Sequence, residues 1–414
     1  MSKVLIHSLV FSPDGVSTAY LYNDIAFKLK EEGYEVVVLT TSPHYNVVKS
    51  ELEKQPLKRK LFGLYYVSNY KGIPVKHVPQ KKFKNSLLRM IGFVFWHIMS
   101  FFLSLFERKI DIILSPSPPL TIGFINIVLG RLKKAKVVYN VQEIYPDLLI
   151  EGGSLKNKPI ISLLKWLERF VYDKSDAVTT IDSVFYDTII KRFNDKSKLH
   201  IIPNFVDTSL YKPLTFDKKR INKDYFPETD ALKIMYAGNI GHAQDWKPLI
   251  QAAISLRDEN IEFFVIGEGV MKDYLEKEKT THDLKKVHLI PYQSRNLMPW
   301  LIAYSDIQFI FMSPHVEGHG FPSKVYTIMA CGKPMLICSG KNTPIVEFLK
   351  DKQCAFLIEE KNLEEKNKQI VKILKSVDRN SLSEMGKRGL AEVELNYSTE
   401  VVTEKYVDLI KSLI

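Results

Sequence analysis

The chain has 414 residues, 45% of them hydrophobic and 25% charged, a composition typical of a folded protein with two domains of ordinary size. The three cysteines, Cys331, Cys338 and Cys354, follow no disulfide or metal-site spacing, so we expect a reduced, cytosolic protein. The net charge of +11 comes without a nucleic-acid motif, which favours an anionic membrane surface or anionic substrate over nucleic acid.

Strand-like and helical patterns alternate along the first half of the chain. Helical patterns such as Ser17–Glu32 and Ile160–Asp173 separate short apolar runs. This alternation predicts a parallel sheet with helices on both faces. The predicted strands are Val4–Val10, Glu35–Thr40, Asp111–Ser115, Lys136–Val141, Ala177–Ile181 and His200–Ile202.

Residues 85–107 are predicted to form an aromatic helix that faces a membrane. Between Leu87 and Phe106, fifteen of twenty residues are apolar and six are aromatic, so the apolar face is wider than docking on a sheet requires. A basic segment precedes the helix, as expected near anionic headgroups. An internal helix and a transmembrane span are the alternatives, although Arg89 and His97 would be costly in hydrocarbon. The residues expected to contact the membrane or the acceptor are Lys81, Lys82, Lys84, Arg89, Phe93, Trp96 and Phe101.

A second series of strand signals follows a proline-containing connection, Pro203–Asp230. Two series predict two doubly wound, Rossmann-like α/β domains, at residues 1–205 and 206–396, that face each other across a cleft. A C-terminal helix at residues 397–414 is expected to pack back on the first domain. The strands predicted here are Lys233–Ala237, Ile261–Ile266, Val287–Ile290, Asp306–Phe311, Pro334–Cys338 and Ala355–Ile358.

Two loops of the first half follow predicted strands and carry candidate catalytic residues. In Phe11–Tyr20, Gly15 would let the backbone approach a ligand, and the helix start would face anionic oxygens. In Val141–Leu149, the Glu143 carboxylate would accept a hydrogen bond from a sugar hydroxyl or an acceptor. A plain tight turn and an exposed loop carboxylate are the corresponding structural alternatives.

The segment Gly318–Pro334 is the most informative part of the chain. It predicts a loop that runs into a helix with Pro322 in its first turn and a stop at Gly332 and Pro334. A helix start favours phosphate, and Ser323 and Lys324 add a hydroxyl and a cation there. An ordinary surface loop before a core helix is the alternative.

These segments resemble, in the expected order over essentially the whole chain, glycosyltransferase family 4 of the GT-B fold. The resemblance is strongest to the subgroup that assembles bacterial surface polysaccharides of the colanic acid, O-antigen and capsule type. The family pattern Glu-Gly-Phe-Pro, four residues, Glu-Ala-Met-Ala-x-Gly-x-Pro matches the segment described above, with His319 and Thr327 at its two glutamates. Gln142 stands where many members have histidine.

The resemblance implies a donor site in the second domain. Most members carry Arg and Lys where this chain has Asn239 and Gln244, so Lys324 is expected to supply the positive charge, with Arg295 as a weaker candidate. Glu317 is expected to substitute partly for the first missing glutamate. The residues expected to bind the donor are Gly238, Asn239, Gln244, Gly267, Glu268, Arg295, Glu317, His319, Gly320, Phe321, Pro322, Ser323 and Thr327.

The resemblance further implies a retaining transferase for a hexosyl or N-acetylhexosaminyl group. It would use a nucleotide-sugar donor, expected to be a UDP-sugar, and a lipid-linked saccharide acceptor at the inner face of the cell membrane. Gly15, Glu143 and Lys324 are the expected catalytic residues. No cofactor or metal is expected, since the sequence has no Asp-x-Asp motif and no clustered ligand set. A nucleotide-sugar epimerase or hydrolase and a non-catalytic, membrane-bound partner subunit are the two alternatives.

Overall fold

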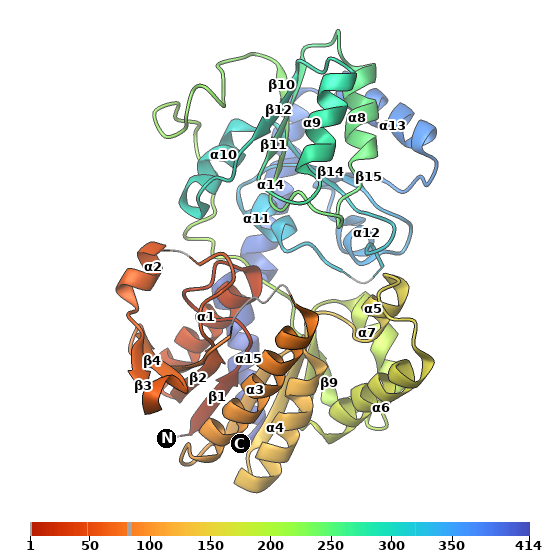
Figure 1. The fold of residues 1–414 in the computed structure, drawn as a ribbon. Helices are drawn as coiled ribbons and strands as arrows, with labels where there is room; N and C mark the ends of the chain where they lie inside the picture. The colour runs from red at the N-terminus through yellow and green to blue at the C-terminus, as the bar shows by residue number, and fades with distance from the viewer. Residues whose placement is uncertain (1, 48, 81–84, 319) are drawn as a thin grey trace. The chain divides into compact units, whose positions relative to one another are not determined.

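The structure is a computed structural model that describes residues 2–47, 49–80, 85–318 and 320–414 (Figure 1). The chain divides into two compact units, which we call unit 1 (Met1–Asn204 with Glu400–Ile414) and unit 2 (Phe205–Thr399). Each unit is built around one sheet with its own strand order. The predicted class, two Rossmann-like α/β domains, is confirmed.

Unit 1 contains a nine-stranded sheet in the order β3-β4-β5-β2-β1-β6-β7-β8-β9. Every strand pair is parallel except the two pairs made by β4. The order reverses between β1 and β6, so the loops after these strands meet at a topological switch point. The bounds are β1 Lys3–His7, β2 Glu35–Thr41, β3 Lys58–Lys60, β4 Tyr65–Tyr70, β5 Ile73–Val78, β6 Ile112–Pro116, β7 Lys136–Val141, β8 Ala177–Thr180 and β9 Leu199–Ile201.

The edge formed by β3, β4 and β5 is absent from the strands predicted from sequence. All three residues of β3 are exposed and β4 is at most half-buried, so neither strand carries the apolar run of a buried parallel strand. The wholly parallel sheet expected for this half is therefore corrected to a mixed sheet with one antiparallel hairpin at its edge.

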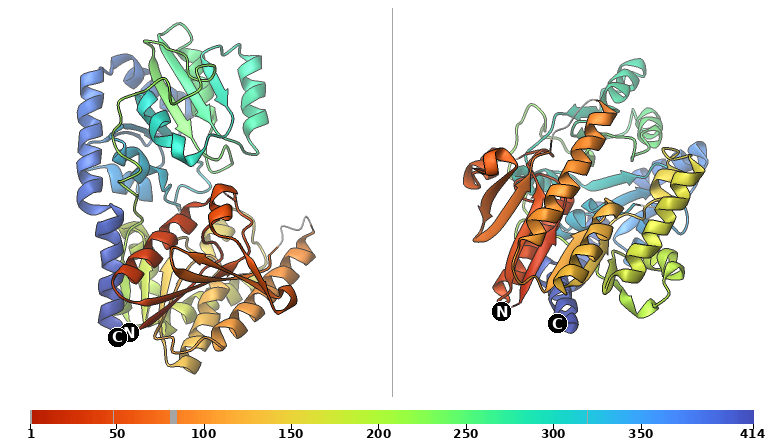
Figure 2. Two further views of the ribbon diagram at one scale, coloured as in Figure 1. Left: turned by 90° about the vertical axis from the view of Figure 1, so that its left-hand side faces the viewer. Right: turned by 60° about the horizontal axis from the view of Figure 1, so that its bottom comes forward.

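The helices of unit 1 pack on its sheet and on one another. Helix α4 packs against both α3 and α6, and Figures 1 and 2 show these three side by side. Helix α15 joins α1 through an ion pair between Lys28 and Glu404 (2.8 Å). The bounds are α1 Ser17–Glu31, α2 Lys49–Lys54, η1 Leu61–Gly63, α3 Ser86–Leu105, α4 Leu120–Lys133, α5 Asp147–Glu151, α6 Lys158–Lys174, α7 Ser183–Ile189, η2 Ile190–Arg192, η3 Lys196–Lys198 and α15 Thr399–Leu413.

Unit 2 contains a six-stranded parallel sheet in the order β12-β11-β10-β13-β14-β15. Its switch point lies between β10 and β13, where ligands of such sheets bind beyond the carboxyl ends of the strands. The strands are β10 Leu232–Ala237, β11 Ile261–Ile266, β12 Val287–Ile290, β13 Ile307–Phe311, β14 Met335–Cys338 and β15 Ala355–Ile358. The helices are α8 Lys247–Ser255, α9 Lys272–Thr281, η4 Arg295–Leu297, α10 Met298–Tyr304, α11 Lys324–Ala330, α12 Pro344–Leu349, α13 Leu363–Ser376 and α14 Arg379–Asn396.

Candidate active site

Two glycine loops interlock at the switch point of unit 2. The N–H of Ile240 donates to the carbonyl of Glu268, and the N–H of Gly238 donates to the carbonyl of Ile266, both at 2.9 Å. A Cβ atom on Gly267 would lie 1.9 Å from the carbonyl oxygen of Gly238, and the two residues have φ angles of 143° and 151°. Only glycine fits such a close backbone approach, so the loops after β10 and β11 form one compact surface of main-chain groups.

Lys324 reaches this surface from the start of α11. Its Nζ donates to the carbonyl of Ala237 (3.1 Å) and lies 3.6 Å from the centroid of the Tyr236 ring. A Cβ atom on Gly238 would be 2.7 Å from the same nitrogen. Burial lowers the pKa of Lys324 to about 7, because desolvation penalises the ammonium. The structure therefore brings Lys324 and the Gly238 loop together, as expected for a cation beside a diphosphate.

Tyr236 is a functional candidate that sequence reasoning misses. Its ring contacts the ammonium of Lys324, and its hydroxyl donates to the carbonyl of Asn239 (2.7 Å). One side chain thus positions both the cation and the loop after β10. The available sequence signal is an aromatic residue at the end of a strand, directly before Ala237 and Gly238, which is also common in cores.

The loop before α11 is held by contacts within unit 2. The Glu317 carboxylate accepts hydrogen bonds from the N–H of Gly340 (2.8 Å) and the hydroxyl of Ser339 (3.3 Å), which joins the loops after β13 and β14. The ring of Phe321 packs against those of Tyr326 and Phe348, with centroids 5.3 and 5.0 Å apart. These contacts make Glu317 and Phe321 supports of the loop that precedes Lys324.

Helix α11 begins later than the sequence indicates. Pro322 precedes the helix, and its carbonyl accepts from the N–H of Val325 (3.0 Å), so the prediction that it occupies the first helical turn is corrected. Lys324, the first helical residue, takes that place. Thr327 follows one turn later on α11 and is half-buried. The helix ends at Ala330, followed by Gly332 with a φ of 65°, which agrees with the expected stop.

Other predicted donor residues have local partners or remain exposed. Gln244 is buried and its side-chain oxygen accepts from the N–H of Phe311 (3.2 Å), which holds the preceding loop to β13. Glu268 pairs with Lys272 (2.8 Å), and the guanidinium of Arg295 lies over the Tyr211 ring (5.9 Å). Asn239 is exposed, and Gly320 and Ser323 are half-buried; His319 lies outside the described residues.

In unit 1, Gly15 belongs to a loop that is fastened to its neighbour. The N–H of Gly15 donates to the carbonyl of Tyr45 (3.0 Å), and the buried Asp14 carboxylate accepts from the N–H groups of His44 and Tyr45 (2.8 Å each). These bonds join the loops after β1 and β2 at the carboxyl edge of the sheet. Gly15 thus lies at the edge where parallel sheets bind ligands.

Glu143 lies after β7 at the same edge. Burial raises its pKa, although a hydrogen bond with the Tyr145 side chain opposes this shift. Burial and the nearby carboxylate raise the pKa of Tyr145 to about 12. The preceding residue, Gln142, exchanges amide hydrogen bonds with Asn204 (3.0 and 2.9 Å). Glu143 is therefore a partly desolvated carboxyl group, while Gln142 is structural.

An ion-pair cluster missed by sequence reasoning supports the segment after Glu143. The Arg192 guanidinium pairs with Asp147 at the start of α5 (2.5 Å) and with Glu168 of α6. Glu168 is only 2% exposed. Because the three residues are far apart in sequence, no local pattern could have identified this cluster.

The four predicted membrane residues that belong to α3 differ in exposure. Trp96 is fully buried, with its ring 5.2 Å from that of His7, so the prediction that it contacts a membrane is wrong: it fills the space between α3 and the sheet. Arg89 is exposed, and Phe93 and Phe101 are half-buried. The predicted basic residues Lys81, Lys82 and Lys84 lie outside the described residues.

Helix α3 is long and apolar enough to span a membrane by length and composition. The qualifying segment is Leu87–Leu105, with a mean hydropathy of 1.6. A buried helix of a soluble protein can pass the same test, but only 22% of this segment's most apolar window is buried.

Within the described ranges, no three His, Cys, Asp or Glu side chains gather where they could hold a metal ion.

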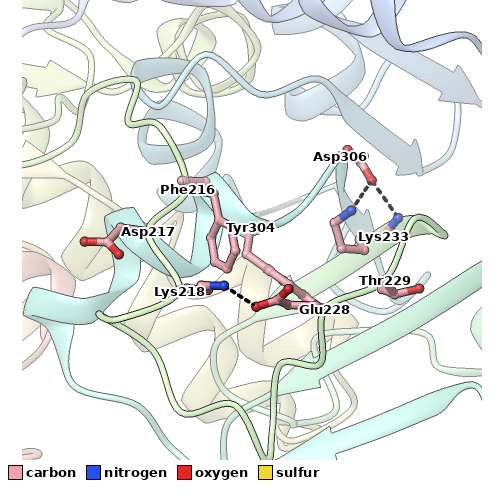
Figure 3. Close-up of a pocket in the computed structure, with 9 residues that line it drawn as sticks. Phe216, Asp217, Lys218, Glu228, Thr229, Lys233, Tyr304 and Asp306 are labelled. Carbon is pink, nitrogen blue, oxygen red and sulfur yellow. Dashed lines mark hydrogen bonds and ion pairs between the residues drawn. The ribbon is translucent and has the colours of Figure 1, made fainter.

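A pocket of about 610 Å³ lies at the opposite edge of the unit 2 sheet, where β10 and β13 begin (Figure 3). Both of its lysines are paired within the pocket: Lys218 with Glu228, and Lys233 with Asp306, both at 3.0 Å. These cations are already neutralised, and they lie far from the carboxyl ends of the strands, where ligands of such sheets bind. We therefore assign the candidate site to the Gly238 loop instead.

Two family profiles match nearly the whole chain. The profile described as "Glycosyltransferase Family 4" matches residues 19–210, and that described as "Glycosyl transferases group 1" matches residues 217–390. The "Putative colanic acid biosynthesis glycosyl transferase WcaI" of Escherichia coli K12 is 24% identical over 83% of this chain and 84% of its own length. The "Probable glycosyltransferase WbjE" of Pseudomonas aeruginosa is 23% identical over 74% of this chain and 76% of its own length.

Solved structures with the same fold cover the full chain. Anabaena Alr3699/HepE in complex with UDP has a TM-score of 0.72 at 14% identity, covering 99% of this chain and 100% of its own. WaaG, a glycosyltransferase involved in lipopolysaccharide biosynthesis, has a TM-score of 0.67 at 15% identity, covering 99% of each chain. At these identities the likeness shows the fold.

Proposed function

This chain belongs to glycosyltransferase family 4 and has the GT-B fold, and on that premise we propose that it transfers a sugar from a nucleoside diphosphate to a growing bacterial surface polysaccharide. The observation that carries the proposal is Lys324 beside the interlocked Gly238 and Gly267 loops. This arrangement supplies main-chain groups and a cation at the switch point of unit 2, where a diphosphate would bind. The relative from Escherichia coli, whose name refers to colanic acid biosynthesis, supports the polysaccharide pathway.

The proposed donor is a UDP-sugar. HepE, which shares the fold, has been solved with UDP and with UDP-glucose, whereas a starch synthase of the same fold holds ADP. The transferred group is proposed to be a hexosyl or N-acetylhexosaminyl residue.

The proposed chemistry is electrostatic and retains the anomeric configuration. An acceptor hydroxyl forms a bond to the anomeric carbon on the face from which the diphosphate leaves, and the bond between that carbon and the β-phosphate oxygen breaks. The acceptor proton passes to a phosphate oxygen of the leaving group. Protonated Lys324 stabilises the negative charge that develops on the diphosphate, so this chemistry requires no metal.

The proposed acceptor is a lipid-linked saccharide at the inner face of the cell membrane. In unit 1, Gly15 and Glu143 lie at the carboxyl edge of the sheet, and the partly desolvated Glu143 is suited to accept a hydrogen bond from a sugar hydroxyl. The apolar outer surface of α3 supports peripheral membrane association. In this proposal, unit 1 selects the acceptor and unit 2 binds the donor.

A thermal-shift panel of nucleoside diphosphates and their sugars tests the proposal, first without divalent metal and then with it. UDP and UDP-sugars should raise the unfolding temperature without metal, since a ligand that binds only the folded state stabilises it. If no nucleotide stabilises the protein, a non-catalytic partner subunit becomes the better explanation. Release of free sugar without any transfer to an acceptor would indicate a hydrolase.

A further inference from the structure

The polar and apolar sides of α3 are arranged opposite to those of an ordinary surface helix. His97, Ser100 and Ser104 are buried, and the His97 ring bonds to Thr121 of α4 (2.9 Å between Nε2 and Oγ1). The polar stripe therefore faces the protein, whereas a water-exposed helix would turn it outward. Eight large apolar side chains are exposed on α3 and at its end: Leu87, Leu88, Met90, Ile91, Val94, Ile98, Phe102 and Phe106.

Helix α4 continues the apolar surface. Phe124 and Leu132 are exposed, and Ile125 and Val128 between them are half-buried. Phe124, Val128 and Leu132 are spaced four residues apart, which places them along one side of the helix, with Ile125 next to Phe124. A helix that is apolar on its outer side as well as its inner side requires a second apolar environment.

Helix α6 extends the surface further. Leu163 and Trp166 are 60% and 56% exposed, and Ile160 is exposed one turn before them. The Trp166 ring stacks on Phe170 of the same helix, and Phe170 contacts Phe124 of α4, with centroids 5.6 Å apart in each pair. This aromatic row connects α6 to α4, and α4 in turn packs against α3.

Exposed cations accompany these apolar residues. Such a large apolar area is unusual on a soluble monomer and marks an interaction site. Lysines next to apolar and tryptophan side chains suit the headgroup region of an anionic bilayer better than the centre of a protein interface, where lysine is depleted. The exposed cations on or beside the three helices are Arg89, Arg108, Lys109, Arg131, Lys134, Lys158, Lys165 and Arg169.

We propose that α3, α4 and α6 form a single docking face for an anionic lipid bilayer, with α6 as a second contact beside α3. The inference rests on the proposed function and deepens it, because contact along three helices fixes the orientation of unit 1 on the membrane. A single helix lying in the interface would leave the protein free to turn about that helix. Neither α4 nor α6 is identified as a membrane element by the sequence.

The test compares the Leu163→Ser/Trp166→Ser protein with a control, Val270→Ser/Leu395→Ser, that removes exposed apolar side chains from unit 2. Co-sedimentation is measured with vesicles of phosphatidylcholine alone and with 30% phosphatidylglycerol. Wild type and control should bind the anionic vesicles equally, and the α6 variant about tenfold or more weakly, because it inserts two fewer apolar side chains. Binding should fall with added salt.

Three outcomes would overturn the proposal: equal binding by the α6 variant and wild type, binding that ignores the anionic lipid, or a dimer in sedimentation velocity that the α6 variant abolishes. The last result would mean that a second copy covers this face. The UDP thermal shift, measured on the same proteins without vesicles, should be unchanged in the α6 variant. Because that readout reports donor binding alone, failure of the docking face and failure of the proposed function are distinguishable.

Discussion

Lys324 combines two properties that normally conflict: it is desolvated, yet its proposed role requires a positive charge. Burial lowers its pKa to about 7, so at neutral pH the free protein holds it only partly protonated. A bound diphosphate favours the ammonium and raises that pKa. Donor binding is therefore expected to take up a proton at this residue.

This coupling predicts how UDP affinity changes with pH. Below pH 7, Lys324 is charged both before and after UDP binds, so it adds no pH dependence to UDP affinity. Above pH 7, UDP binding must be accompanied by protonation of Lys324, so UDP affinity falls by up to about tenfold per pH unit. Isothermal titration calorimetry between pH 7 and 9 measures this decline, in a range where the diphosphate is already ionised. The Lys324→Met protein should bind more weakly at pH 7 and show no such decline. A wild-type affinity that is flat with pH would contradict the role of Lys324.

Tyr236 should contribute to donor binding through its ring more than through its hydroxyl. Tyr236→Leu removes the ring beneath the ammonium of Lys324, so UDP affinity should fall about thirtyfold, the size of a desolvated cation–π contact of about 2 kcal/mol. Tyr236→Phe keeps the ring and loses only the hydrogen bond to Asn239, so its loss should be smaller. Calorimetry at pH 7 compares the two proteins. Equal losses would assign the effect to the loop contact alone.

At the scale of elements, the loops after β10 and β11 form one unit because their backbones touch at Gly267. Gly267→Ala should abolish the UDP thermal shift and lower stability by about 2 kcal/mol or more, because the new Cβ meets the Gly238 carbonyl and φ is positive. Gly33→Ala is the matched control, since Gly33 has a φ of 88° and open space around it. That control should cost about 1 kcal/mol and leave UDP binding intact. Equal effects would mean that backbone strain, and not the contact between the loops, is responsible.

The Arg192 cluster joins α5 and α6, and its loss should be costly. Arg192→Met leaves Glu168 buried without its partner, which should destabilise the protein by about 3 kcal/mol in chemical denaturation. Burial already raises the pKa of Glu168 to about 7, and removing Arg192 raises it further. The folded variant then holds a proton that the unfolded chain releases, so its stability deficit should grow as pH rises from 6 to 8. Arg257→Met, at an exposed position, should change stability little at either pH.

At the scale of the whole molecule, the end of the chain belongs to unit 1 although all of unit 2 comes before it. Val402, Tyr406, Val407 and Ile410 of α15 are buried, and Glu404 pairs with Lys28 of α1. Unit 1 is therefore completed only when Glu400–Ile414 has been synthesised. Its stability should depend on them more than on any surface loop.

Deletion of Glu400–Ile414 should unfold unit 1, since each of those four buried side chains stabilises the fold by about 1.5–3 kcal/mol. Differential scanning calorimetry should then show the loss of one transition, while a transition raised by UDP remains. Deletion of Ser412–Ile414 alone is the control, because these residues are largely exposed. If the protein with the longer deletion gave the same thermogram as the full-length protein, α15 would be dispensable.

Much of the fold can be predicted locally, because buried parallel strands are continuous apolar runs. The predicted bounds of β7, β11, β12 and β15 agree with the structure to the residue. The exposed edge strand β3 lacks such a run and cannot be predicted in this way. In the candidate site, Lys324 is predictable from its family motif. Tyr236 is not, because it contacts Lys324 only when the start of α11 lies beside the end of β10, 87 residues earlier in the chain.

The sequence by itself determined the family, the two α/β units and the position of the cation in the donor loop. These properties depend on apolar periodicity and on short motifs, both of which are local. The tertiary structure alone decided that Trp96 is buried, that the polar stripe of α3 faces inward, and that α4 and α6 extend its apolar surface. The physical reason is that the residue pattern of a helix distinguishes its polar side from its apolar side. Only packing against neighbouring elements decides which of these sides contacts water, protein or lipid.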